Sequence, residues 1–204
     1  MLSLELASQA LFFNMSMKRL RVIFFLFIFI QGILYIFLIP PGQSPDEWHH
    51  FGYGVVLSKG GKAIPTAYEN VDKKIVESMA AFHAWKYQNM PRPDVLPNKY
   101  SEVKIFGGVS GNITSLSRRA PLYYVISSFI MKGTKINGFL NQFYLIRGFS
   151  LILFLLSVYF TYLSARILFK DNPLYCFAAV SFVSFLPQFV IISTSVNPIN
   201  LAVF

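Results

Sequence analysis

Residues 22–39, with the sequence VIFFLFIFIQGILYIFLI, decide the fold class of this chain. The run contains no charged residue and ends at Pro40-Pro41. About 18 to 20 apolar residues in an α-helix are long enough to cross the hydrocarbon core of a bilayer. A secretory signal peptide has a shorter apolar core, of about 7 to 15 residues, that leads into small residues. The run therefore predicts an uncleaved first transmembrane helix.

The composition also indicates a membrane protein. Hydrophobic residues make up 54% of the chain and charged residues 13%, whereas a soluble domain carries about 25% charged residues. The net charge of +9 favours contact with lipid headgroups. We expect no nucleic-acid partner, because the sequence contains no basic-aromatic motif of a nucleic-acid-binding module. Cys176, the one cysteine, lies in an apolar run and is expected to be a small buried hydrophobe.

Basic residues predict the orientation of the first helix. Lys18, Arg19 and Arg21 directly precede it, and an excess of lysine and arginine marks the cytoplasmic side. Residues 1–21 are therefore expected in the cytoplasm. Residues 40–119, which hold most of the charges, are expected to form a large extracytoplasmic loop with short helices.

Residues 120–204 predict about three further transmembrane helices. Their apolar runs cover residues 120–131, 143–165 and 174–196. The first run is short and spans a bilayer only if Lys132 and Lys135 snorkel to the far interface. Simple alternation then places the link 166–173 outside, although Arg166 and Lys170 lie in it. We expect an all-α polytopic protein of the cell membrane with about four transmembrane helices.

The chain stops in residues 197–204 as if another apolar segment were starting, without a polar tail. We therefore expect it to be the N-terminal fragment of a longer polytopic protein, or to need other membrane subunits as partners.

The stretch SPDEWHHF, residues 44–51, follows the first helix and has two interpretations. In the structural one, Ser44 caps a helix, Pro45 occupies its first position, and Glu47 completes a capping box. The aromatic residues nearby would then lie at headgroup level. They are Trp48, Phe51 and Tyr53.

In the functional interpretation, Asp46, His49, His50 and Tyr53 share one face of the same helix, because residues three and four apart are neighbours. A carboxylate and an imidazole at this spacing can share a proton or ligate a metal ion. The capping box needs neither Asp46 nor the two histidines. Both interpretations stay open at this point.

Two further features carry charge at the membrane. Arg118 and Arg119 precede Tyr123 and Tyr124, and they either snorkel to lipid phosphates or bind the phosphate of a substrate bidentately. Arg147 lies near the start of a predicted span, where a charge either snorkels or faces a polar cavity.

The order of these motifs resembles the N-terminal part of the GT-C class of polytopic glycosyltransferases. The details are most similar to a family of predicted membrane proteins called domain of unknown function 2142. The resemblance rests on PDEWHHF (residues 45–51), PLYY (121–124), RGFS (147–150), LPQF (186–189) and SVN (195–197). Each motif is short, so their order and spacing carry the resemblance.

The resemblance implies a role for each matching residue. Asp46 corresponds to the acidic residue that acts as general base or orients the acceptor in GT-C enzymes. Glu47 and His50 would support it, and a divalent metal held by Asp46 and His50 is an open alternative. Arg119 stands where relatives have histidine, which removes a histidine-specific role but keeps a cation for the donor phosphate. Residues 198–200 lack the aspartate that relatives carry there.

The implied activity is transfer of a sugar from a polyprenyl-phosphate-linked donor, on the extracytoplasmic side of the membrane. The alternatives are a non-catalytic accessory or degenerate membrane subunit and a segment of a transporter. A transport path needs charge inside the membrane, and among these residues Arg147 is the clearest candidate.

Overall fold

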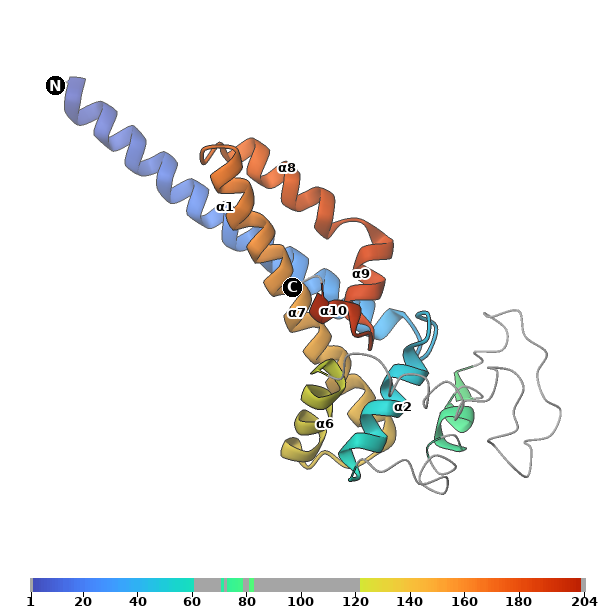
Figure 1. Cartoon of the computed structure of the whole chain (residues 1–204). Coiled ribbons are helices and arrows are strands. Elements are labelled where there is room, and N and C mark those ends of the chain that lie inside the picture. Colours follow the sequence, from blue (N-terminus) through green and yellow to red (C-terminus); the bar gives the residue numbers. More distant parts are fainter. Residues whose placement is uncertain (1, 61–70, 72, 79–80, 83–121, 203–204) are drawn as a thin grey trace.

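A computed structural model describes residues 2–60, 71, 73–78, 81–82 and 122–202, with the backbone alone for residues 2–16. These ranges contain helices and connecting segments but no strand. The helices are α1 (Leu2–Leu38), α2 (Glu47–Ser58), α6 (Leu122–Thr134), α7 (Phe139–Leu168), α8 (Pro173–Ser184), α9 (Pro187–Thr194) and α10 (Ile199–Ala202) (Figure 1). Residues 71, 73–78 and 81, inside the predicted extracytoplasmic loop, are also helical.

Two of these helices are long and apolar enough to cross a membrane. They are Met17–Leu38 within α1, and α7. The pair α8 and α9 makes a third crossing if the two are one broken span. The chain is therefore compatible with an integral membrane protein that has two or three membrane-spanning helices in the part described. The predicted second span is not among them, because α6 has 13 residues in the part of the chain described and about 20 are needed to cross a bilayer.

Prolines set the limits of the membrane helices. α1 ends at Leu38, two residues before Pro40-Pro41. The predicted single span over residues 174–196 is divided, because α8 ends at Ser184 and Pro187 begins α9 at an angle of 64°. Proline has no N–H and its ring clashes with the preceding helical turn, so it begins a helix more readily than it continues one.

α1 and α7 run side by side in opposite directions (Figure 1). Near the start of the apolar part of α1, the Arg21 guanidinium donates a hydrogen bond of 3.4 Å to the Tyr162 hydroxyl of α7. Consequently residues 166–173 lie at the same end of the helix pair as Lys18 and Arg19. The expected placement of residues 166–173 is on the opposite side. That expectation requires a membrane crossing at residues 120–131.

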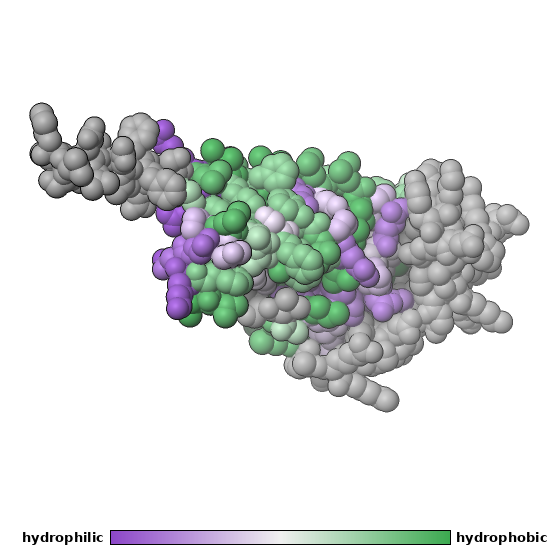
Figure 2. Space-filling view, turned by 90° about the horizontal axis from the view of Figure 1, so that it is seen from above, coloured by the Kyte–Doolittle hydropathy of each residue, from purple (hydrophilic) through white to green (hydrophobic). Residues whose placement is uncertain are grey.

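Two hydrophobic clusters form the interior. The first joins α1, α7, α8 and α9, and contains Ile28, Ile36, Leu151, Phe154, Val158, Val180 and Val190. The second joins α2, α6 and the first half of α7. Outside these clusters, large apolar side chains cover the surface of the membrane helices, for example Val22 and Phe182. Figure 2 shows hydrophobic residues across the middle of one face and hydrophilic residues toward its ends.

The aromatic residues of α2 belong to the second cluster. Trp48, Phe51 and Tyr53 are 4%, 1% and 6% exposed. The Trp48 ring packs 4.7 Å from the Phe143 ring of α7. These side chains therefore pack against α6 and α7 and do not form an exposed aromatic belt. Cys176 is buried, as predicted.

Candidate functional site

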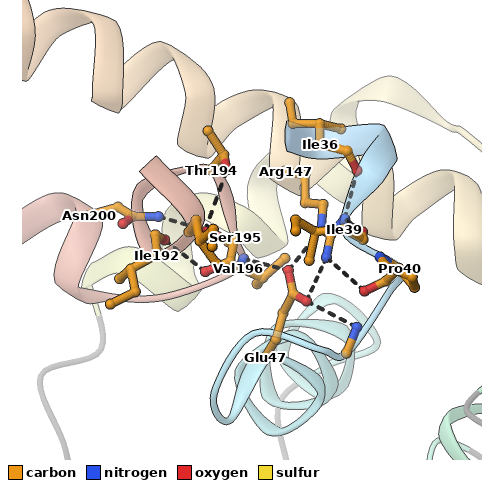
Figure 3. A network of polar contacts seen from close by, with 12 residues as sticks. Ile36, Ile39, Pro40, Glu47, Arg147, Ile192, Thr194, Ser195, Val196 and Asn200 are labelled. Carbon is orange, nitrogen blue, oxygen red and sulfur yellow. Dashed lines mark hydrogen bonds and ion pairs between the residues drawn. The ribbon is translucent and has the colours of Figure 1, made fainter. Parts of the chain in front are cut away.

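A buried ion pair links the start of α2 to α7 (Figure 3). The Arg147 side chain donates from Nε to Glu47 Oε1 at 2.8 Å and from Nη2 to Glu47 Oε2 at 2.7 Å. Both residues are 1% exposed. Two parallel hydrogen bonds between a guanidinium and a carboxylate are among the strongest polar contacts in proteins. Arg147 therefore neither snorkels nor lines an open polar cavity in this structure.

The remaining donors of Arg147 bond to backbone carbonyl groups at the end of α1 and just beyond it. Nη1 donates to the carbonyl oxygens of Ile36 and Ile39, each at 2.6 Å, and Nη2 donates to Pro40 O at 3.3 Å. The last carbonyl groups of a helix have no partner within the helix, and a cation there also complements the helix dipole. All five N–H groups of the guanidinium are thus satisfied.

The carboxylate of Glu47 accepts two more hydrogen bonds, both from backbone N–H groups. Gly42 N donates to Oε2 and Val196 N donates to Oε1, each at 3.0 Å. We call Glu47, Arg147 and the backbone groups bonded to them the ion-pair network. It fixes α2, α7, the end of α1 and the segment between α9 and α10 against each other.

Asp46 immediately precedes this network and points elsewhere. It occupies the N-cap position of α2 in a left-handed conformation, with φ of 55°, and its side chain makes no capping hydrogen bond. Its backbone carbonyl accepts from the N–H groups of His49 and His50, at 3.0 and 3.1 Å. The side chain of Asp46 is exposed. This geometry leaves the carboxylate on the surface where α1 gives way to α2.

The predicted capping box is wrong. The N-cap is Asp46 rather than Ser44, and the helix begins at Glu47. Glu47 does not turn back toward Ser44, because its carboxylate is held by Arg147 and two backbone N–H groups.

His50 contacts α6. Its Nδ1 lies 2.8 Å from the Tyr124 hydroxyl, and the Tyr53 ring packs edge-on against Tyr124 at 4.7 Å. Tyr123 points its hydroxyl to Ser150 Oγ of α7, at 3.0 Å. Tyr123 and Tyr124 are buried, so in this structure the two tyrosines position α6 against α2 and α7. Arg118 and Arg119 lie outside the described residues.

His49 is 7% exposed, and its burial lowers the pKa below 6.5, whereas nearby Asp46 opposes this shift. The folded state therefore binds a proton on His49 less readily than the unfolded chain. Its contribution to stability is complete above about pH 6.5 and is lost as the pH falls toward the lowered pKa.

We expect the unfolding temperature of the protein in a mild detergent to fall between pH 7 and pH 5.5. In the His49→Gln variant this fall is expected to be smaller, since the glutamine does not titrate. Circular dichroism during heating at each pH measures both. Equal pH dependence of the two proteins would assign the effect to other groups.

Among the residues described, no group of three or more His, Cys, Asp and Glu side chains is placed to hold a metal ion. For the pair expected from the sequence, His50 Nδ1 already lies at hydrogen-bonding distance from Tyr124, and the Asp46 side chain is at the surface. In this arrangement Nδ1 of His50 is therefore engaged with Tyr124 rather than free to ligate a metal ion.

The sequence interpretation missed the backbone groups of the network. Nothing in the residue types of Gly42 or Val196 marks their N–H groups as partners of a carboxylate. One signal was available, because an arginine in an apolar span needs an acidic or carbonyl partner, and Glu47 was a candidate acid.

Comparisons of this chain with protein-family models, with curated proteins and with solved structures found no match, so the family resemblance stays a prediction.

Proposed function

We propose that this chain belongs to an inverting membrane glycosyltransferase that uses a polyprenyl-phosphate-linked sugar on the extracytoplasmic side. The observation that carries the proposal is the placement of Asp46. Its exposed carboxylate lies eight residues beyond the end of the apolar helix α1 and is not used to cap α2. A lipid-linked donor presents its phosphate at this boundary between bilayer and water. In this proposal the N-terminus is cytoplasmic.

The backbone at Asp46 supports the proposal. A positive φ is uncommon for a residue other than glycine, and such strained conformations are concentrated at functional sites. Aspartate tolerates this conformation better than most residues, so strain alone does not require a function. The adjacent ion-pair network holds Glu47, and therefore the start of α2, at a fixed position. A rigid support of this kind is what a catalytic carboxylate requires.

In the proposed reaction the carboxylate of Asp46 takes the proton from a hydroxyl of the acceptor. The acceptor oxygen forms a bond to the anomeric carbon, and the bond from that carbon to the phosphate oxygen breaks. The lipid phosphate leaves with the electron pair. All five N–H groups of Arg147 are already bonded within the protein, so we assign the stabilising cation to Arg118 and Arg119. Glu47 supports Asp46 without contacting the sugar.

Asp46→Asn tests this proposal, because the amide keeps the size of the side chain and cannot take the proton. Membranes that contain the protein, in its natural length, are supplied with radiolabelled polyprenyl-phosphate hexoses, and label transferred to endogenous acceptors is counted. Loss of a general base is expected to lower the transfer rate by about 100-fold or more. Glu77→Gln removes another exposed carboxylate, 48% accessible at its side chain, and is expected to leave the rate unchanged.

A non-catalytic subunit of a membrane complex is the second candidate. The observation in its favour is that Glu47 and Arg147 are fully occupied by contacts within the chain. In that case membranes that contain normal amounts of the Asp46→Asn protein transfer sugar at the normal rate, and the catalytic proposal is lost.

A further inference from the structure

A pocket opens at the end of the helix bundle opposite Asp46. It lies between α1, α7 and the start of α8 and has a volume of about 290 Å³. Its polar walls are Arg21, Tyr162, Arg166 and Asp171. We call it the basic pocket. None of its residues belongs to the ion-pair network or to the proposed reaction.

Two arginines bring positive charge into the basic pocket. Arg21 is partly buried and makes two long hydrogen bonds, of 3.3 Å to Met17 O and 3.4 Å to the Tyr162 hydroxyl. Arg166 pairs with Asp171 at 2.5 Å, and both side chains of that pair are substantially exposed, at 43% and 66%. An exposed ion pair contributes little stability, so Arg166 can exchange this partner at little cost.

Further positive charge lies at the same end of the helix bundle as the pocket. Lys18 and Lys170 are exposed and adjoin the lining residues Met17 and Asp171 in the sequence, and Arg19, also exposed, lies two residues from Met17 and Arg21. Together with Arg21 and Arg166 they give five cations, against the single carboxylate of Asp171 in the lining. The surplus favours an anionic ligand.

The other walls of the pocket are apolar and lie at the edge of the lipid-facing surface. Met17, Pro173, Cys176 and Phe177 form them. Beside the pocket, Leu20, Ile167 and Leu174 are 48%, 84% and 71% exposed, and the apolar segment Met17–Leu38 starts here. A ligand in the pocket therefore meets cations on one side and the acyl region of the bilayer on the other.

We propose that the basic pocket binds the phosphodiester headgroup of an anionic glycerophospholipid. An arginine fork matches the geometry of two phosphate oxygens, and basic pockets between transmembrane helices suit acidic headgroups. The lipid belongs to the leaflet on the side of Lys18 and Arg19, which the excess of basic residues identifies as cytoplasmic. The apolar walls contact the glycerol and the first acyl carbons, and a free phosphate ion lacks these groups.

Native mass spectrometry of the full 204-residue chain in detergent tests the proposal. The protein is titrated with phosphatidylglycerol or phosphatidylcholine. We expect tighter binding of phosphatidylglycerol, and in the double variant Arg21→Gln/Arg166→Gln we expect its affinity to fall about 10-fold or more. Lys132→Gln/Lys135→Gln removes the same charge at the end of α6 and is expected to keep the preference.

A gain of affinity provides an independent measurement if the double variant folds poorly. In Asp171→Asn, Arg166 loses its competing carboxylate, so phosphatidylglycerol is expected to bind about 3-fold more tightly or better. Inorganic phosphate at millimolar concentration is expected not to displace the lipid. Equal binding of the two lipids, an unchanged affinity in Asp171→Asn, or displacement by phosphate would each overturn the proposal. The last result would assign the pocket to a soluble anion.

Discussion

Glu47→Gln is expected to lower the free energy of unfolding by about 3 to 5 kcal/mol, the usual cost of leaving a buried charge without its partner. The carboxylate accepts from Arg147 Nε and Val196 N on one oxygen, and from Arg147 Nη2 and Gly42 N on the other. A glutamine directs its amide NH₂ at one of these donor pairs whichever way it is turned. The amide NH₂ of the glutamine then faces one Arg147 N–H and one backbone N–H, with no acceptor between them. The guanidinium of Arg147 stays buried and charged.

Titration with a denaturing detergent, followed by circular dichroism, measures this loss. Glu77→Gln makes the same chemical change in the exposed Lys73–Glu77 pair, at 3.8 Å, and is expected to cost less than about 1 kcal/mol. Similar losses in the two variants would show that water reaches Glu47.

A double-mutant cycle with Arg147→Met separates the pair from its surroundings. The double variant Glu47→Gln/Arg147→Met is expected to lose less stability than the sum of the two single variants, because each single change leaves a buried partner behind. It is still expected to be less stable than the unaltered protein, since the carbonyl groups of Ile36, Ile39 and Pro40 lose a donor.

Gly42→Ala is expected to destabilise the protein by about 2 kcal/mol or more, for two separate reasons. Gly42 has φ of +81°, which other residues adopt only with strain. In addition, an added Cβ would lie 1.6 Å from Nε1 of the Trp48 indole, which is buried between α2 and α7. Moving that ring disturbs the aromatic cluster and pulls the Gly42 N–H away from Glu47.

Two other glycines provide matched controls. At Gly32, in α1, the added Cβ would meet the end of the Leu151 side chain at 2.3 Å, which can shift, so a smaller loss is expected. At Gly133, in α6, nothing lies within 4 Å, and alanine there is expected to be neutral or to stabilise the helix by about 0.5 to 1 kcal/mol. Thermal unfolding in detergent ranks the three. Equal losses at Gly42 and Gly133 would contradict the tight packing of Trp48.

The first membrane helix and its end could be predicted from the sequence because an apolar run and a following pair of prolines are local signals. Pro187 is a local signal for the bend after Ser184, since it lies inside the apolar run 174–196. The number of apolar residues in the run does not indicate this bend. The apolar run 120–131 likewise predicts a second crossing, and the 13 described residues of α6 are shorter than a bilayer-spanning helix.

The candidate site was predictable in its residues but not in its contacts. Asp46, Glu47, His50, Tyr124 and Arg147 were singled out by type and position. Which of them meet depends on how α2 packs, and Glu47 and Arg147 are 100 positions apart in the chain. No periodicity reports a contact at that separation. It is the packing of the α2 aromatics on α6 and α7 that turns Glu47 inward and leaves Asp46 outside.

That separation of 100 positions also sets an order of events during synthesis. At about 5 to 20 residues added per second, Glu47 leaves the ribosome roughly 5 to 20 s before Arg147. During this interval the guanidinium that neutralises the carboxylate has not yet been made, so Glu47 keeps water as its partner. Val196 emerges later still, 49 residues after Arg147. The newly made chain therefore completes the hydrogen bonds of the Glu47 carboxylate only after the segment between α9 and α10 has been synthesised.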